Sequence, residues 1–198
     1  MKKRLFISVS AALVVSVLIS ITGFAQTCAN LRGEVLRLHI LAHSDSDEDQ
    51  ALKLKVRDRL LSESIFTESE NKEEALKKAL ESLDLITETA KDEIVKNGYD
   101  YDVKVEITEM RFTTREYDTF TLPAGRYEAV RVLIGEGNGK NWWCVMFPPL
   151  CVPAATDKKK PDDVFTSKES QLMTEKPKYK MKFKIIEIFE GIRSRFSK

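Results

Sequence analysis

The sequence has few of the residues on which most catalytic sites depend. It contains two histidines, His39 and His43, only four positions apart, and three cysteines. The two histidines lie close together, on and just after a predicted strand that contains no cysteine, so a nucleophilic cysteine is not expected. The chain also lacks an Asp-Thr-Gly, a serine nucleophile elbow and a His-Glu-x-x-His motif. We therefore expect a binding protein with no catalytic residue, no cofactor and no metal.

An excess of charge of one sign is also absent. The chain has 32 basic and 31 acidic side chains, with a net charge of +1. Basic and acidic residues are interspersed over most of the chain, as on an ordinary solvated surface. Without an overall positive field, nothing in the composition points to nucleic acid as a partner.

Residues 1–25 have the pattern of a signal peptide. A basic start at residues 2–4 precedes the uncharged run 5–21, and the small residues Gly23 and Ala25 form a signal-peptidase pattern. The 17 uncharged residues also reach the lower limit for crossing a bilayer, so a retained N-terminal anchor is the alternative. Since basic residues stay in the cytoplasm, either reading places the rest of the chain outside it.

Hydrophobic periodicity predicts an α+β domain over residues 30–152. Residues 34–42 alternate, with one wholly apolar face, which predicts a strand with one side on a core. The turn that follows leads into a helix capped by Ser46 and ending near Ser64, and a second amphipathic helix is predicted from Asn71 to Lys96.

Alternating residues then predict three or four antiparallel strands. Residues 135–140 (GEGNGK) are predicted to be a hairpin loop between the last two strands, which cover residues 126–134 and 141–147. The loop resembles a phosphate-binding loop only superficially, because Ile134 stands where its first glycine belongs and a strand follows. The predicted fold is a mixed, mostly antiparallel sheet with two helices on one face, in the order β-α-α-β-β-β(-β).

The composition changes after this domain. Residues 153–179 are rich in Pro, Lys, Asp, Ser and Thr, and we predict a flexible linker. Residues 180–197 recover a helical apolar stripe, and residues 176–198 carry eight basic and two acidic side chains. Such a helix is suited to an anionic membrane surface or a partner groove, although folding back on the domain is an equal alternative.

The cysteines suggest one disulfide. Cys144 and Cys151 are close in sequence, and an exported chain meets an oxidising environment, so we favour a bond between them over two free thiols. Cys28 lies at the end of the leader, and the residues before it make a poor lipobox.

The histidine pair and the two adjacent tryptophans are two further candidate sites. His39 and His43 with the nearby acids make an exported metal-binding module or small enzyme the alternative function, but a metal normally needs three or four convergent ligands. Trp142 and Trp143 point to opposite faces of a strand, so at most one belongs to the core. The other is a candidate interface residue. We predict a partner-binding face from two segments, with the candidate residues Ser44, Asp45, Ser46, Asp47, Trp142, Trp143, Phe147 and Pro148.

Several long segments resemble the stage II sporulation protein R family. They are residues 36–46 (LRLHILAHSDS), 48–58 (EDQALKLKVRD), 122–137 (LPAGRYEAVRVLIGEG) and 139–151 (GKNWWCVMFPPLC). One departure is His43, where the family pattern has asparagine, and it makes the histidine pair look incidental. Nothing after Val152 carries a motif of the family.

The resemblance implies a role in signalling and no reaction. Members are made in the forespore and exported to the space between the forespore and mother-cell membranes. There they activate a membrane-embedded aspartic protease, which removes the pro-segment of a mother-cell sigma factor precursor. Residues 30–152 would then be the signalling domain, with that protease as its receptor and partner.

Overall fold

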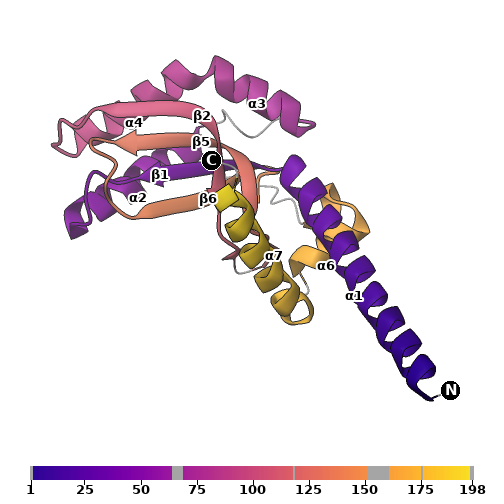
Figure 1. The fold of residues 1–198 in the computed structure, drawn as a ribbon. Coiled ribbons are helices and arrows are strands. Elements are labelled where there is room, and N and C mark those ends of the chain that lie inside the picture. Colours follow the sequence, from indigo (N-terminus) through magenta and orange to yellow (C-terminus); the bar gives the residue numbers. More distant parts are fainter. Residues whose placement is uncertain (1, 64–68, 118, 151–160, 175, 197–198) are drawn as a thin grey trace. The chain divides into compact units, whose positions relative to one another are not determined.

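The computed structural model describes residues 2–63, 69–117, 119–150, 161–174 and 176–196 (Figure 1). The elements, in chain order, are α1 (Lys2–Gly33), β1 (Leu36–Leu41), α2 (Asp47–Ser62), α3 (Lys72–Glu81), α4 (Leu83–Lys96), β2 (Val103–Phe112), β3 (Arg115–Glu116), β4 (Thr121–Leu122), β5 (Gly125–Ile134), β6 (Asn141–Phe147), α5 (Pro161–Val164), α6 (Ser167–Thr174) and α7 (Lys176–Phe196). The fold is α+β with a mixed sheet, as predicted.

The chain divides into two compact units. Unit 1 consists of Met1–Gly33, Phe112–Gly125 and Phe165–Lys198, and unit 2 consists of Glu34–Arg111 and Arg126–Val164. The single domain predicted over residues 30–152 is therefore interrupted, because residues 112–125 belong with the two ends of the chain. Each unit is described below by itself.

Unit 2 is built on a four-stranded sheet in the order β2-β5-β1-β6. β1 is parallel to β5, with Leu38 opposite Val130, and antiparallel to β6, with Leu38 opposite Cys144. All six residues of β1 are buried, which explains its central place in the sheet. The sequence predicted burial of one face only. On the second face Arg37 is also buried, and its guanidinium lies 5.1 Å from the ring centre of Tyr127.

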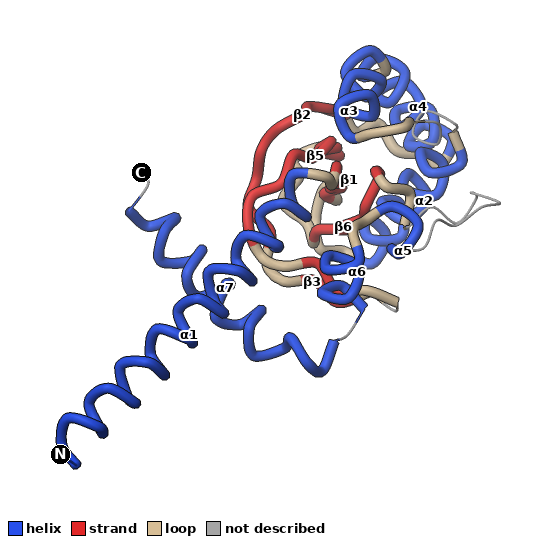
Figure 2. The backbone as a smooth tube through the Cα atoms, turned by 90° about the vertical axis from the view of Figure 1, so that its right-hand side faces the viewer, coloured by secondary structure: helices blue, strands red, loops and turns tan. Residues whose placement is uncertain are grey.

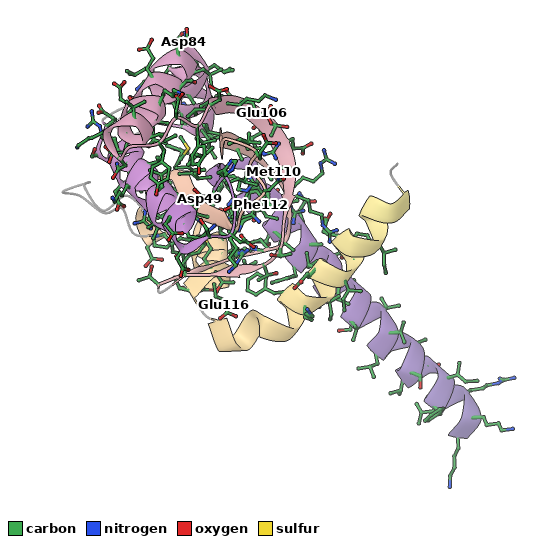
Figure 3. The ribbon with its side chains drawn as sticks, turned by 90° about the vertical axis from the view of Figure 1, so that its left-hand side faces the viewer. Asp49, Asp84, Glu106, Met110, Phe112 and Glu116 are labelled. Atoms are coloured by element: carbon green, nitrogen blue, oxygen red, sulfur yellow. The ribbon has the colours of Figure 1, made fainter. Side chains whose placement is uncertain are left out.

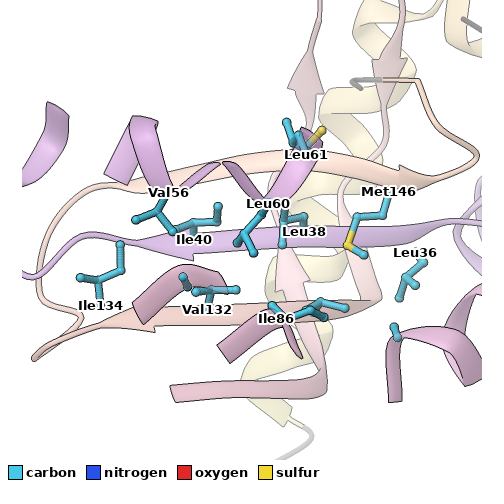
Figure 4. Packing of buried hydrophobic residues seen from close by; sticks show 14 of the residues in the cluster. Leu36, Leu38, Ile40, Val56, Leu60, Leu61, Ile86, Val132, Ile134 and Met146 are labelled. Atoms are coloured by element: carbon cyan, nitrogen blue, oxygen red, sulfur yellow. The ribbon is translucent and has the colours of Figure 1, made fainter. Parts of the chain in front are cut away.

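Helices α2, α3 and α4 cover the apolar face of this sheet (Figures 2 and 4). The prediction of one helix over residues 71–96 is wrong, because the chain leaves the helical conformation at Ser82, whose φ and ψ are −103° and 8°. The Ser82 N–H is shared between the carbonyls of Lys78 and Ala79, which ends α3. Serine has a weaker helix preference than its neighbours. The break leaves Ile86 in the core while Leu80 is 52% exposed.

The predicted hairpin between the last two strands is also wrong. β5 and β6 are not neighbours, since β1 lies between them. Residues 135–140 therefore cross over the end of β1. The residues of a turn do not determine which strand lies between the two that it connects.

Unit 1 contains α1, the small β3–β4 sheet, α6 and α7. Its core includes Phe24 and Leu31 of α1, Leu172 and Met173 of α6, and Phe183 of α7. The described part of residues 153–179, the segment predicted to be a flexible linker, contains α5 and α6, and α6 buries apolar side chains. The predicted C-terminal helix is present as α7, starting four residues earlier, at Lys176.

Candidate functional site

The polar turn after β1 is held by a network of short-range hydrogen bonds. Ser46 is the N-cap of α2, and its hydroxyl accepts a hydrogen bond from the Asp49 N–H at 3.2 Å, as the sequence predicted. The Ser44 hydroxyl donates to the Asp49 carboxylate, and the Gln50 amide donates to the Ser44 carbonyl at 2.8 Å. Asp47 and Glu48 remain exposed beside the positive end of the helix. The turn is therefore rigid, with acidic side chains on its outside.

The loop from Gly135 to Lys140 packs directly on this turn. The Glu136 N–H donates to His43 Nδ1 at 3.1 Å, and the Lys140 N–H donates to the Asp45 carboxylate at 2.6 Å. The Gly139 N–H donates to the Ala42 carbonyl at 2.9 Å. Turn and loop thus form one connected structure, which we call the β1-end surface and define as residues 43–48 and 135–140.

Glycine is required where the loop passes over the turn. A Cβ at Gly139 would overlap the Ser44 carbonyl, and a Cβ at Gly135 would overlap the His43 ring. Gly135 also has a φ of +56°, which disfavours any side chain. Gly135 and Gly139 therefore allow the close approach of the loop to the turn.

Asp49 and Lys53 anchor the site from inside. Burial raises the pKa of the Asp49 carboxyl, but hydrogen bonds from the Ser44 and Tyr101 hydroxyls outweigh burial, and the pKa falls below its usual 3.8. The Lys53 ammonium donates to the carbonyl of Lys140 at 2.8 Å, and burial lowers its pKa. These two charged groups support the turn and the loop and are not available to a partner.

The structure brings only part of the predicted partner face together. Ser44, Asp45, Ser46 and Asp47 lie at the end of β1 that Trp142 approaches, since Trp142 pairs with Ile40. Phe147 pairs with Leu36 at the opposite end of β1, and Phe147 and Pro148 are buried. The loop at Gly135–Lys140, interpreted from sequence as a plain turn, takes their place. The three alternating glycines of this loop were the feature of the sequence that could have indicated its close packing on the turn.

The two tryptophans lie on opposite faces, as predicted, and both are half-buried. Trp142 packs against the helix-side core, with the Arg57 guanidinium 5.0 Å from its ring centre. Trp143 stacks on His39, with ring centres 3.9 Å apart. Both side chains therefore have packing roles of their own, and substituting either would test folding as much as binding.

The histidine pair does not converge. His39 lies on the Trp143 face of the sheet, and its Nε2 is 2.6 Å from Asn141 Oδ1. His43 stacks on Tyr101, which packs against the helix-side core, and its Nδ1 accepts the Glu136 N–H. Over the residues the structure describes, no group of three or more His, Cys, Asp or Glu side chains could hold a metal ion.

Cys144 is buried in β6, whereas Cys151 lies outside the described residues. The bond between them therefore stays a prediction.

Comparison with known proteins places the chain in a sporulation family. The family model of stage II sporulation protein R matches residues 32–157, and the chain belongs to this family. "Stage II sporulation protein R" of Bacillus subtilis (strain 168) is 40% identical over 120 residues, which is 60% of this chain and 54% of that relative. The chain thus matches about half the length of this relative. No solved structure matches. The family supports a role in sporulation, and the resemblance in the sequence is confirmed.

Proposed function

We propose that the chain is an exported sporulation signal. It is made in the forespore, acts in the space between the forespore and mother-cell membranes, and activates a membrane-embedded aspartic protease. The protease then processes the precursor of a mother-cell sigma factor. The chain itself acts as a ligand and catalyses no reaction.

The observation that carries this proposal is the family match over residues 32–157, which covers the sheet and the β1-end surface. The uncharged N-terminal run of α1 is compatible with export, as a signal peptide or as an anchor. We expect the rest of the chain to lie outside the cytoplasm, where a receptor's external loops are within its reach.

The β1-end surface is the proposed contact with the protease. Its backbone is fixed by the hydrogen bonds from Glu136 and Lys140 to His43 and Asp45, so a partner meets a preformed surface and little ordering entropy is lost. Asp47 and Glu136 are exposed on it, and their carboxylates take no part in the two hydrogen bonds just named. They are the side chains best placed to report on binding without disturbing the fold.

The test uses sporulating cells that lack their own copy of the gene and produce the full chain in the forespore. Precursor processing is followed by immunoblotting in cells with the natural chain, Glu136→Lys or Asp47→Asn. We expect Glu136→Lys to slow processing about tenfold, the equivalent of about 1.4 kcal/mol of binding. Asp92→Lys, on an exposed position of α4, is the matched control and should process normally. Normal processing by Glu136→Lys and Asp47→Asn, at equal protein level, would remove the β1-end surface as the contact.

A further inference from the structure

The helix α1 changes its environment near residue 22. Before this point its apolar side chains are exposed, with Ile19 66% exposed, and beyond it Phe24, Cys28 and Leu31 are buried in unit 1. Among the described residues, α1 is a helix long and apolar enough to cross a membrane. If the exposed part lies in a bilayer, the bilayer surface falls close to Ser20–Phe24.

α7 meets α1 at this same level. The Lys182 ammonium lies 3.3 Å from the Ser20 hydroxyl and 5.5 Å from the Phe24 ring centre. Phe183 packs edge-on against Phe24, with ring centres 5.5 Å apart. Both views of the pair, in Figures 2 and 3, show α7 running across α1 and not along it. A helix that crosses the span at this height runs along the membrane surface.

The two sides of α7 differ in what they contact. Phe183 and Ile186 are buried toward the rest of unit 1. On the other side, four large apolar residues spaced three or four apart are between 43% and 58% exposed, namely Ile185, Ile188, Phe189 and Ile192. Lys184 is exposed beside this stripe, within a segment that has a local excess of six positive charges. This combination is typical of helices that lie in the interface of an anionic membrane.

A cavity of about 300 Å³ opens between α1, α6 and α7 at the same height. Ile19, Gly23 and Phe24 form its apolar wall, and Lys168 and Lys182 contribute the positive charges. An apolar wall at the end of a membrane span, with two ammonium groups beside it, suits the phosphate and upper acyl chain of one anionic phospholipid.

We propose that α7 lies in the outer surface of the membrane that holds α1, and that the cavity binds the headgroup of an anionic phospholipid. The proposal includes retention of α1 as an anchor, because cleavage after Ala25 would remove Ser20 and Phe24 and with them these contacts. A second copy of the chain is a poorer occupant of the apolar stripe, because it would bring two positive segments together. The proposal does not depend on the identity of the receptor.

The test reconstitutes the full chain in vesicles whose lipids carry bromine at the upper acyl chain, a contact quencher of tryptophan fluorescence. Phe189→Trp reports on α7, and Leu85→Trp, 49% exposed on α4, is the matched control. The natural chain provides the background from Trp142 and Trp143. We expect Trp at 189, and not at 85, to be quenched in vesicles containing phosphatidylglycerol. Quenching should weaken in phosphatidylcholine alone.

Charge variants in the Phe189→Trp chain then test the cavity. Lys168→Gln should lower the ratio of docked to undocked α7 about fivefold in phosphatidylglycerol vesicles, whereas Lys77→Gln in α3 should leave it unchanged. Equal quenching at positions 85 and 189, or none at 189, would overturn the membrane placement. A blue-shifted emission at 189 that grows with the protein-to-lipid ratio, without quenching, would instead show self-association. An unchanged ratio in Lys168→Gln would overturn the headgroup site alone.

Discussion

His39 makes the stability of unit 2 sensitive to acid. Its imidazole pKa is lowered from 6.5 to about 4, mainly by burial, with a smaller contribution from the charges of Arg131 and Arg37, and the hydrogen bond to Asn141 opposes the shift. On β2, Glu106 faces the same side and is paired with Arg131. The unfolded chain therefore binds a proton on His39 between pH 6.5 and pH 4, and the folded chain does not.

The size of this effect follows from the two pKa values. At about 1.4 kcal/mol for each pH unit between them, the free energy of unfolding should fall by about 2–3 kcal/mol from pH 7 to pH 4.5. The direction of the change in unfolding free energy follows from the lowered pKa of His39 in the folded chain. The stabilisation is complete above the pKa that His39 has in the unfolded chain, and it is lost as the pH falls toward the pKa in the folded chain. Asp49 contributes only at lower pH, since its pKa lies below 3.8.

Urea unfolding of the full chain in neutral detergent, followed by tryptophan fluorescence at several pH values, measures this slope. His39→Gln keeps an amide that can donate to Asn141 but does not titrate, so its unfolding free energy should be nearly flat from pH 7 to pH 4.5. The two chains are compared by how steeply the free energy of unfolding changes with pH. A loss of stability that is the same at every pH therefore does not affect the comparison. If His39→Gln retained the slope of the natural chain, the buried neutral histidine would not be its cause.

Two further predictions concern the β1-end surface. Gly139→Ala places a Cβ against the backbone of Ser44 and should cost about 1–3 kcal/mol in urea unfolding, while Gly33→Ala, with open space around it, should be neutral; equal effects would contradict the close approach. Ser46→Ala removes the N-cap of α2 and should cost about 1 kcal/mol, and a loss below about 0.3 kcal/mol would show that the cap contributes little.

Local patterns of the sequence predicted much of the fold. The alternation around Leu38 and Val130 identified strands, and Ser46 identified the start of α2, because these features depend on neighbours a few residues away. The order of strands in the sheet depends on contacts between distant segments. For that reason the insertion of β1 between β5 and β6 was missed, and with it the role of the loop.

The candidate site was predicted in part for the same reason. Asp45 and Trp142 were predicted to share a partner-binding face, and both lie near the end of β1, but the contacts that hold them there depend on distant segments. Phe147 was assigned to the face because it is an aromatic residue at the end of a predicted strand that also carries Trp142. Trp142 and Phe147 lie near the two ends of the seven-residue strand β6. They therefore lie beside opposite ends of β1, although they are close in sequence.

The central claim is that the β1-end surface contacts the membrane-embedded protease from outside the cytoplasm. The most direct measurement places a photo-crosslinking amino acid at position 136 of the full chain in sporulating cells, with position 92 as the control. The account predicts a crosslink to the protease from position 136 and none from position 92, under conditions in which the sigma factor precursor is processed. Normal processing without any crosslink from position 136, or an equal crosslink from both positions, would contradict it.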